Sequence, residues 1–358
     1  MTDLKNDIGK IDRNLEVKKN IDVSDCVFYD VKNPSFRIYG LCDLNNGFRR
    51  LPQEIAKAGG EKIERLSAQT AGGRVRFSTD SEYIAIRCVM PYITRFSHMQ
   101  LMGTSGFDMY IFENGKSRHI NSFMPSSGIE DGYSSVYHFG GRKKREIIIN
   151  FPPYNPVQEL CIGVEENAEI SAGSEYTYKL PVVYYGSSIT QGACASRPGN
   201  TYTALISHEY DCDYINLGFS GAPMGNEPIV DYISELDMSA FVYDFDYNAP
   251  SMDYLQETHA QIFNKIREKQ PELPIIIMSA ADAPVLKNIE KKRDIAFKTY
   301  SDARSGGDEN VYFIDGKKLY EGPFSESCRV DGVHPTDAGF FRMADIVGKQ
   351  IISILMRG

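Results

Sequence analysis

The sequence lacks several features that mark large classes of proteins. Its 48 acidic residues outnumber its 39 basic ones, for a net charge of -9, so nothing indicates the basic surface that binds a phosphate backbone. No apolar run approaches the roughly 20 residues that span a bilayer. The polar start of the chain also lacks the basic and apolar stretches of a secretory signal. We therefore expect neither nucleic acid nor a membrane among its partners.

Patterns for disulfides and metal sites are also missing. The seven cysteines are scattered without a C-x-x-C pair, and the histidines form no His-x-x-x-His pair, so we expect no metal and no cofactor. An odd number of cysteines without a signal segment favours reduced thiols over a disulfide framework. The sequence therefore predicts a cytoplasmic protein.

The length of 358 residues favours two domains, and the first part of the chain reads as all-β. Apolar and polar residues alternate with period two from about residue 36 to residue 166, turn residues recur at short intervals, and no long helical period is seen. This pattern predicts an antiparallel, jelly-roll-like β-sandwich over residues 1–178. The clearest strands are expected at Arg74–Thr79, Tyr83–Val89, Phe107–Phe112, Glu146–Phe151 and Glu159–Val164.

Strands and helices alternate after a Gly/Ser/Glu-rich link at residues 172–175. Helical patterns are expected at residues 201–210, through residues 254–266 and from Thr336 onward. This order predicts an α/β domain over residues 179–358, in which helices cover both faces of a five-stranded, flavodoxin-like parallel sheet. Ligands bind beyond the carboxyl ends of such strands. The strands are expected at Pro181–Tyr185, Tyr214–Leu217, Ala240–Phe245, Pro274–Ser279 and Val311–Ile314.

A Gly-Ser-Ser turn follows the first of these parallel strands. Ser188, at its end, is placed where a serine nucleophile is exposed for attack, although the same letters also suit a simple strand-to-helix turn. The neighbouring Ser187 is expected to point away and to have a structural role.

A carboxylate and an imidazole stand three residues apart just before the last helix. Asp331 is placed to orient His334, which would then activate a serine. The alternative is a surface loop with a capping carboxylate. The other histidines lack such a setting; they are His98, His119, His138, His208 and His259.

Two further strand ends carry candidate hydrogen-bond donors. Gly221 follows the second strand, and its N–H is a candidate donor to a developing oxyanion; Asn248 follows the third strand and offers its side-chain amide. The alternatives are a glycine-rich turn and an Asx turn. Asp244 and Asp246 are expected to support the loop by hydrogen bonding and not to be catalytic.

The order of these segments along the chain, and their positions at strand ends and before the last helix, resemble the SGNH (GDSL-like) hydrolase superfamily. The segments are the turn at Ser188, Gly221, Asn248 and the Asp331–His334 pair. The resemblance covers roughly residue 180 to the C-terminus. It implies that Ser188 is the nucleophile, His334 the general base and Asp331 the residue that orients it. It also implies an oxyanion hole made of the Ser188 N–H, the Gly221 N–H and Asn248. Two departures from the family pattern are Ser187, where aspartate is usual, and the missing glycine before Asn248.

The first half carries a narrower resemblance. The run from Gly106 to Tyr110 is similar to the Gly-x-Asp-Leu-Tyr signature of a β domain that precedes some of these enzymes, and residues 70–77 fit the same domain. Asp108 and Tyr110 are candidates for substrate contact or, alternatively, for packing at a strand end. Arg197 is a candidate for binding substrate hydroxyls or for pairing with an acidic neighbour such as Glu227.

The two-domain arrangement resembles bacterial carbohydrate esterases. It implies a serine esterase that removes acetyl groups from hemicellulose-derived oligosaccharides, such as mannan or xylan fragments, through an acyl-enzyme. Two alternatives stay open: a lipase or thioesterase for longer acyl chains, and an inactive carbohydrate-binding protein on the same scaffold. A homo-oligomer is also left open.

Overall fold

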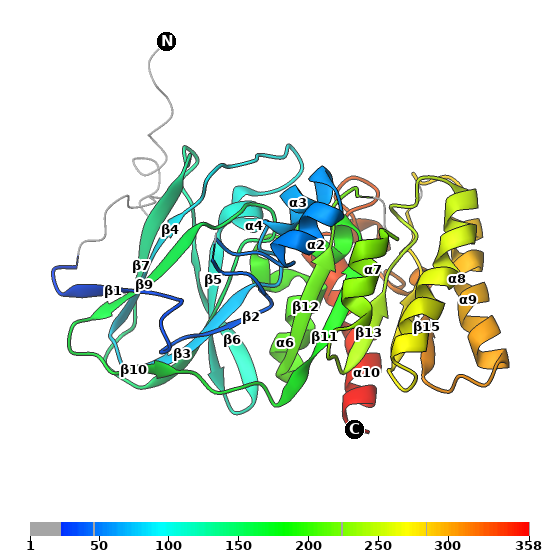
Figure 1. Cartoon of the computed structure of the whole chain (residues 1–358). Coiled ribbons are helices and arrows are strands. Elements are labelled where there is room, and N and C mark those ends of the chain that lie inside the picture. Colours follow the sequence, from blue (N-terminus) through cyan, green and yellow to red (C-terminus); the bar gives the residue numbers. More distant parts are fainter. Residues whose placement is uncertain (1–22, 46, 223–224, 284, 358) are drawn as a thin grey trace, which may run out of the picture.

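The computed structural model describes residues 23–45, 47–222, 225–283 and 285–357, and within them the chain forms two halves side by side (Figure 1). The first half consists of antiparallel sheets and the second of a parallel sheet covered by helices. The predicted boundary at residues 178 and 179 falls at the start of strand β11 (Tyr178–Gly186). No helix among the described residues is both long and apolar enough to cross a membrane.

The N-terminal half is a sandwich of two sheets, as the period-two pattern predicts. One sheet has the order β1-β9-β4-β7; the other has the order β10-β3-β8-β5-β6, with β2 paired to β3. Alternate residues of both sheets, such as Val75, Ile84 and Ile147, form one buried apolar cluster. The strands are β1 (Cys26–Asp30), β2 (Arg37–Tyr39), β3 (Arg74–Thr79), β4 (Tyr83–Val89), β5 (Phe107–Glu113), β6 (Lys116–Phe123), β7 (Gly132–His138), β8 (Arg145–Asn150), β9 (Glu159–Glu165) and β10 (Ile170–Ala172).

The C-terminal half is a parallel sheet with the order β12-β11-β13-β14-β15, which confirms the flavodoxin-like prediction. Helices α7, α8 and α9 cover one face, and α6 and α10 cover the other. Its elements after β11 are α5 (Ser188–Gln191), α6 (Tyr202–Tyr210), β12 (Cys212–Gly218), α7 (Glu227–Ser234), β13 (Ala240–Tyr243), α8 (Met252–Lys269), β14 (Ile275–Met278), α9 (Ile289–Ser305), β15 (Val311–Ile314) and α10 (Asp337–Leu355).

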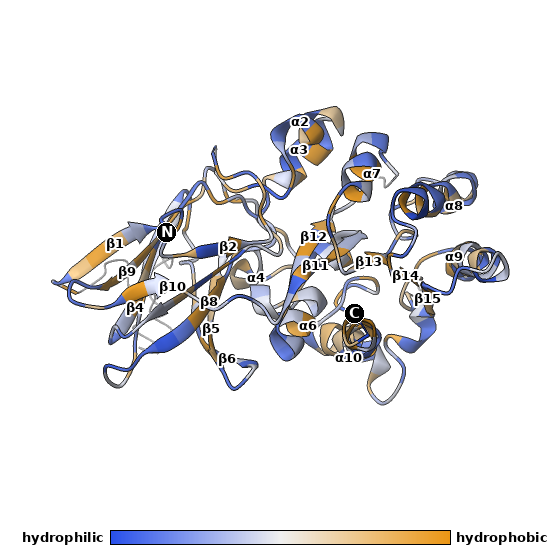
Figure 2. Ribbon diagram, turned by 60° about the horizontal axis from the view of Figure 1, so that its bottom comes forward, coloured by the Kyte–Doolittle hydropathy of each residue, from blue (hydrophilic) through white to orange (hydrophobic). Residues whose placement is uncertain are grey.

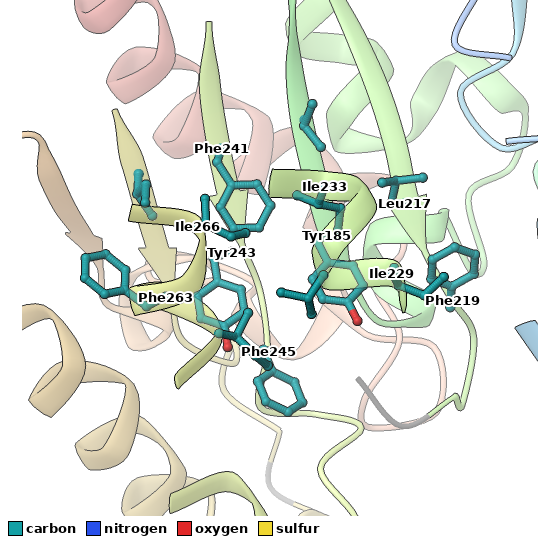
Figure 3. Packing of buried hydrophobic residues seen from close by; sticks show 14 of the residues in the cluster. Tyr185, Leu217, Phe219, Ile229, Ile233, Phe241, Tyr243, Phe245, Phe263 and Ile266 are labelled. Carbon is teal, nitrogen blue, oxygen red and sulfur yellow. The ribbon is translucent and has the colours of Figure 1, made fainter. Parts of the chain in front are cut away.

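Aromatic side chains fill the space between the sheet and the α7–α8 layer. Figure 3 shows Tyr185 of β11 and Tyr243 of β13 packed against Ile229 and Ile233 of α7 and Phe263 of α8, and all of them are buried. The sheet strands are hydrophobic where the helices cover them (Figure 2). The burial of both faces explains why these strands read as continuous apolar runs.

Besides the short helix α4 (Leu101–Ser105), the described part of the first half contains two helices that the period-two pattern does not reveal. They are α2 (Gln53–Ala58) and α3 (Glu61–Ser67), and they lie beside α7 over the parallel sheet (Figure 2). Their residues Ala56, Ile63 and Leu66 belong to the same core as Leu217 and Phe219. The sequence shows no helical period here because both helices are short and their apolar faces pack on a sheet that follows much later in the sequence.

The free edge of the parallel sheet, strand β12, is closed by arginines of the first half. Arg50 donates to the carbonyls of Asn216 and Gly218 at 3.0 and 2.7 Å, and Arg74 donates to the carbonyl of Tyr214 at 3.0 Å. Alternate carbonyls of an edge strand point away from its neighbour and need partners. The N-terminal half supplies those partners, and these hydrogen bonds hold it against the sheet.

Two buried ion pairs reinforce this contact between the halves. Arg74 pairs with Asp213, and Arg76 pairs with Asp211 at 2.9 Å. Both arginines come from β3 and are buried. The two halves are therefore joined by charge-assisted bonds along β12, the strand that leads to the candidate site.

Candidate active site

Ser188 is the first residue of α5, at the end of the apolar strand β11. The preceding Ser187 is buried, and its Oγ accepts a hydrogen bond from the Ile189 N–H at 3.2 Å, so it caps the helix as expected. A Cβ at Gly186 would lie 2.0 Å from Thr190 Oγ1. Only glycine therefore permits this turn, which directs Ser188 toward the carboxyl end of the sheet.

The structure brings Ser188, His334 and Asp331 together in one hydrogen-bonded chain. Ser188 Oγ lies 2.9 Å from His334 Nε2, and His334 Nδ1 lies 2.7 Å from Asp331 Oδ2. The second oxygen of Asp331 accepts from the backbone N–H of His334 at 2.8 Å and of Val333 at 3.1 Å. The loop before α10 is thus folded around its own carboxylate, and this holds the imidazole toward Ser188.

Asp331 is held in its charged form. Partial burial would raise its pKa, but hydrogen bonds from the His334 ring and from the N–H groups of His334 and Val333 outweigh that effect and lower the pKa to about 2. A carboxylate that stays ionised in this position fixes the imidazole tautomer with hydrogen on Nδ1. Nε2 is then free to accept a proton from Ser188.

The candidate oxyanion donors lie at three strand ends. The Ser188 N–H begins α5 and therefore has no acceptor within the helix. Gly221 has a φ of 61°, a left-handed conformation that favours glycine, and its carbonyl accepts from Lys62 Nζ of α3 at 2.5 Å. Asn248 Nδ2 donates to Phe219 O at 3.0 Å, which ties its loop to the strand end before Gly221. An amide carries two N–H groups, so one remains for a ligand.

The structure places Asp108 and Tyr110 in the contact between the halves. Both are buried, and both bind Arg197: Asp108 Oδ2 lies 2.8 Å from its Nη1, and the Tyr110 hydroxyl also contacts it. Asp108 also accepts from the Gly199 N–H at 2.8 Å. Arg197 therefore pairs with Asp108 and not with Glu227, which lies near Lys265 instead.

The segment from Gly192 to Thr201, which follows the Ser188 helix, is held from a second side by Asp337. This carboxylate accepts from the Ser196 N–H at 2.9 Å and from Asn200 Nδ2 at 2.8 Å. Asp337 stands in the first turn of α10, three residues after His334. The same segment thus connects the nucleophile helix, the histidine loop and the N-terminal half.

Two residues that sequence reasoning did not place at the site lie beside His334. His98, from the loop after β4, has its ring centroid 5.5 Å from that of His334. The ligand atoms of His98, Cys194 and His334 lie within 4.8 Å of one another. No local pattern in the sequence marks His98, and only the packing of the two halves brings it beside His334.

Two buried aspartates support the site from below, as the sequence predicts. Asp244 accepts from Thr190 Oγ1 of the Ser188 helix at 2.9 Å, and Asp246 accepts from the Ala280 N–H at 2.6 Å. Burial raises the pKa of Asp244 to about 8 and that of Asp246 to about 6, and the charge of Asp246 adds to the shift at Asp244. Both are too enclosed to contact a substrate.

Two family models match, and together they cover most of the chain. Residues 179–352 match the GDSL-like Lipase/Acylhydrolase family, and residues 26–170 match the domain described as the N-terminus of Esterase_SGNH_hydro-type. No curated protein matches the chain.

Solved structures with the same two-part arrangement are similar over nearly their whole length. A protein from Bacteroides ovatus that is described as a GDSL-like lipase by similarity is 26% identical with a TM-score of 0.83, over 92% of this chain and 98% of its own. The salicylyl-acyltransferase of a tetracycline biosynthetic pathway is 17% identical with a TM-score of 0.72, over 93% and 98%. An acetyl xylan esterase from the rumen bacterium Butyrivibrio proteoclasticus is 12% identical with a TM-score of 0.60, over 93% and 99%.

Proposed function

We propose that this chain, which belongs to the SGNH (GDSL-like) hydrolase superfamily, is a serine esterase that removes acetyl groups from acetylated, hemicellulose-derived oligosaccharides. The observation that carries the proposal is the hydrogen-bonded chain from Ser188 Oγ through His334 to Asp331, with 2.9 and 2.7 Å between the bonded atoms. A serine, an imidazole and a carboxylate in this order are the parts that nucleophilic acyl transfer requires.

The first half of the reaction transfers the acetyl group to the enzyme. Ser188 Oγ attacks the ester carbonyl while His334 Nε2 takes its proton, and the charged Asp331 stabilises the imidazolium that forms. His334 then returns the proton to the sugar oxygen as the ester bond breaks. The products of this half are the free hydroxyl of the sugar and an acetyl group bound to Ser188.

The second half frees the enzyme. Water gives its proton to His334 as it attacks the acetyl carbonyl, acetate leaves, and the proton returns to Ser188 Oγ. In each half the carbonyl oxygen gains negative charge, which the N–H groups of Ser188 and Gly221 and the amide of Asn248 would stabilise. The bond from Asn248 to Phe219 O supports this role, since it joins the two donor loops.

The acetylated sugar is the part of the proposal drawn from likeness of fold. The acetyl xylan esterase shares the arrangement of a β-sandwich before the hydrolase sheet. In this chain the sandwich contributes His98 beside His334, so a substrate that reaches Ser188 meets both halves. Mass spectrometry of acetylated mannan and xylan oligosaccharides after incubation tests the substrate: successive losses of one acetyl group identify both the bond and the preferred backbone.

A lipase or thioesterase for longer acyl chains is the second candidate, favoured by the similarity to the Bacteroides protein described as a GDSL-like lipase. It would use the same three residues. Comparison of p-nitrophenyl acetate with the decanoate ester separates the two, because the proposed deacetylase prefers the acetate. Faster hydrolysis of the decanoate would refute the proposed acetyl substrate but would leave the serine mechanism in place.

An inactive carbohydrate-binding protein, the third hypothesis, would bind the oligosaccharides in calorimetry without hydrolysing them.

The cytoplasmic location stays a prediction, which cell fractionation tests. All seven cysteines are free thiols in the structure.

A further inference from the structure

We propose that His98, Cys194 and His334 form a binding site for a divalent transition-metal ion, with Zn²⁺ as the ion to test, and that its occupation switches the esterase off. Their ligand atoms lie within 4.8 Å of one another. They come from three separate segments: the loop after β4, the segment after α5 and the loop before α10. The proposed hydrolysis uses only His334, so the convergence of the other two calls for another explanation.

The chemistry of the three side chains suits zinc. Two imidazoles and one thiolate form a borderline-soft set that selects Zn²⁺ over harder ions such as Mg²⁺. Bonds of about 2.0–2.3 Å in a tetrahedral site place neighbouring ligand atoms roughly 3.3–3.7 Å apart. The three side chains must therefore approach one another by about 1 Å from their separation of at most 4.8 Å. His98 lies outside any helix or strand, where such a shift is least restricted.

His334 is already oriented as a metal ligand. Its Nδ1 lies 2.7 Å from Asp331 Oδ2, and a carboxylate on one ring nitrogen is the usual outer partner of a histidine that binds zinc through the other. That other nitrogen, Nε2, lies 2.9 Å from Ser188 Oγ. A metal on Nε2 would displace the serine proton from its acceptor, and the Ser188 hydroxyl or water would fill the fourth position. Hydrolysis would then stop for lack of a general base.

Cys194 is held toward the cluster by an uncommon backbone conformation. Its φ of 71° lies in the left-handed region, which residues other than glycine rarely adopt, and its Sγ donates to His98 O at 3.5 Å. A metal bound at Cys194 would displace the thiol proton to solvent, and the thiolate would be the ligand.

The first experiment measures inhibition of p-nitrophenyl acetate hydrolysis by Zn²⁺, with reversal by a chelator. Relative to its own rate without zinc, Cys194→Ser should need a zinc concentration for half-inhibition that is higher by about 100-fold or more, because loss of a direct ligand costs at least what loss of an outer partner does. Cys42→Ser is the matched control, since Cys42 is an exposed thiol outside the cluster, and it should behave as the parent. Equal zinc sensitivity of the parent and Cys194→Ser would overturn the proposal.

A second experiment needs no activity. Inhibition rests on the proposed function, but metal binding does not, so Co²⁺ is added to Ser188→Ala and a thiolate-to-cobalt charge-transfer band is recorded. The band should disappear in Ser188→Ala/Cys194→Ser and persist in Ser188→Ala/Cys42→Ser. A band in Ser188→Ala, combined with a parent protein that hydrolyses no acetyl ester, would support the metal site and refute the proposed function. Absence of the band would refute the site whatever the activity.

Discussion

Arg50 Nη1 lies 2.7 Å from the carbonyl oxygen of Gly218, a bond between the N-terminal half and the strand end that leads into the active site. The same guanidinium reaches the carbonyl of Asn216 at 3.0 Å and those of Leu66 and Gln69 at 2.7 Å each. Burial lowers the pKa of Arg50 to about 9. The planar fork of an arginine can serve several carbonyls at once, which a lysine cannot.

Arg50→Lys should therefore weaken both the fold and the reaction. An ammonium leaves some of the four buried carbonyls without donors, at about 1–3 kcal/mol each, so we expect the free energy of unfolding to fall by about 3 kcal/mol. We also expect a lower kcat, because β12 leads directly to Gly221. Urea unfolding and p-nitrophenyl acetate hydrolysis measure the two effects. Arg118→Lys, on an exposed position of β6, should change the stability by no more than about 0.5 kcal/mol.

Local patterns were enough for much of the fold and for the serine-histidine-aspartate arrangement. The strands Tyr83–Val89 and Val311–Ile314 have the predicted bounds, because alternation, apolar runs and turn residues act over a few neighbouring positions. A Gly-Ser-Ser turn marks Ser188 and a spacing of three residues marks Asp331 and His334, and the resemblance to the SGNH hydrolases links the two segments. Neither prediction needed the contact between the halves.

What depends on that contact could not be read from the sequence. The neighbours of Arg197 and His98 come from the other half of the chain: Asp108 for the first, and His334 for the second. Helix α3 was missed for the same reason, since its apolar residues belong to the same core as Leu217 of β12 and Ile229 of α7. A single sequence can indicate that a side chain is buried or charged. It does not show which residue, far away in the sequence, lies next to that side chain.

Alanine substitutions at the two neighbouring serines, made one at a time, should distinguish the catalytic serine from the structural one. Ser188→Ala removes the nucleophile, and we expect the hydrolysis of acetyl esters to fall by roughly 10⁶-fold with unchanged stability. Ser187→Ala removes the helix cap and should cost about 1 kcal/mol of stability while most activity remains. Esterase assays and thermal unfolding of both proteins give the comparison. Full activity in Ser188→Ala would refute the serine mechanism.

Asn248→Ala should slow the reaction without removing it. The amide supplies one of the proposed oxyanion donors, and loss of a single donor typically lowers kcat by about 10²–10³-fold. The KM should change little, because the negative charge exists only during the reaction. A KM that rises while kcat stays constant would instead assign Asn248 to ground-state binding of the sugar.

Asp108→Ala tests whether the aspartate of the Gly-x-Asp-Leu-Tyr signature supports the segment after the nucleophile. The change removes the charged partner of Arg197 and the acceptor of Asn150 and of the Gly199 N–H, and loss of one partner of a buried pair costs about 3 kcal/mol or more. We expect lower stability and a lower kcat together. A higher KM with unchanged unfolding would show instead that Asp108 contacts the substrate. Glu113→Ala, which removes an exposed ion pair on the same strand, is the control.

Asp244→Asn should change how stability depends on pH. Burial and the charge of Asp246 raise the pKa of Asp244 from 3.8 to about 8, so the folded protein binds this proton more tightly than the unfolded chain does. Its contribution to stability is complete below about pH 4 and is lost as the pH rises toward 8. Asparagine cannot ionise and can still accept from Thr190, so the variant should lose less stability between pH 5 and pH 8 than the parent. Urea midpoints at these two pH values give the comparison, with Asp253→Asn, at an exposed position of α8, as the control that should follow the parent. Parallel pH dependence in Asp244→Asn and the parent would mean that this carboxyl is ionised in the folded protein throughout the range.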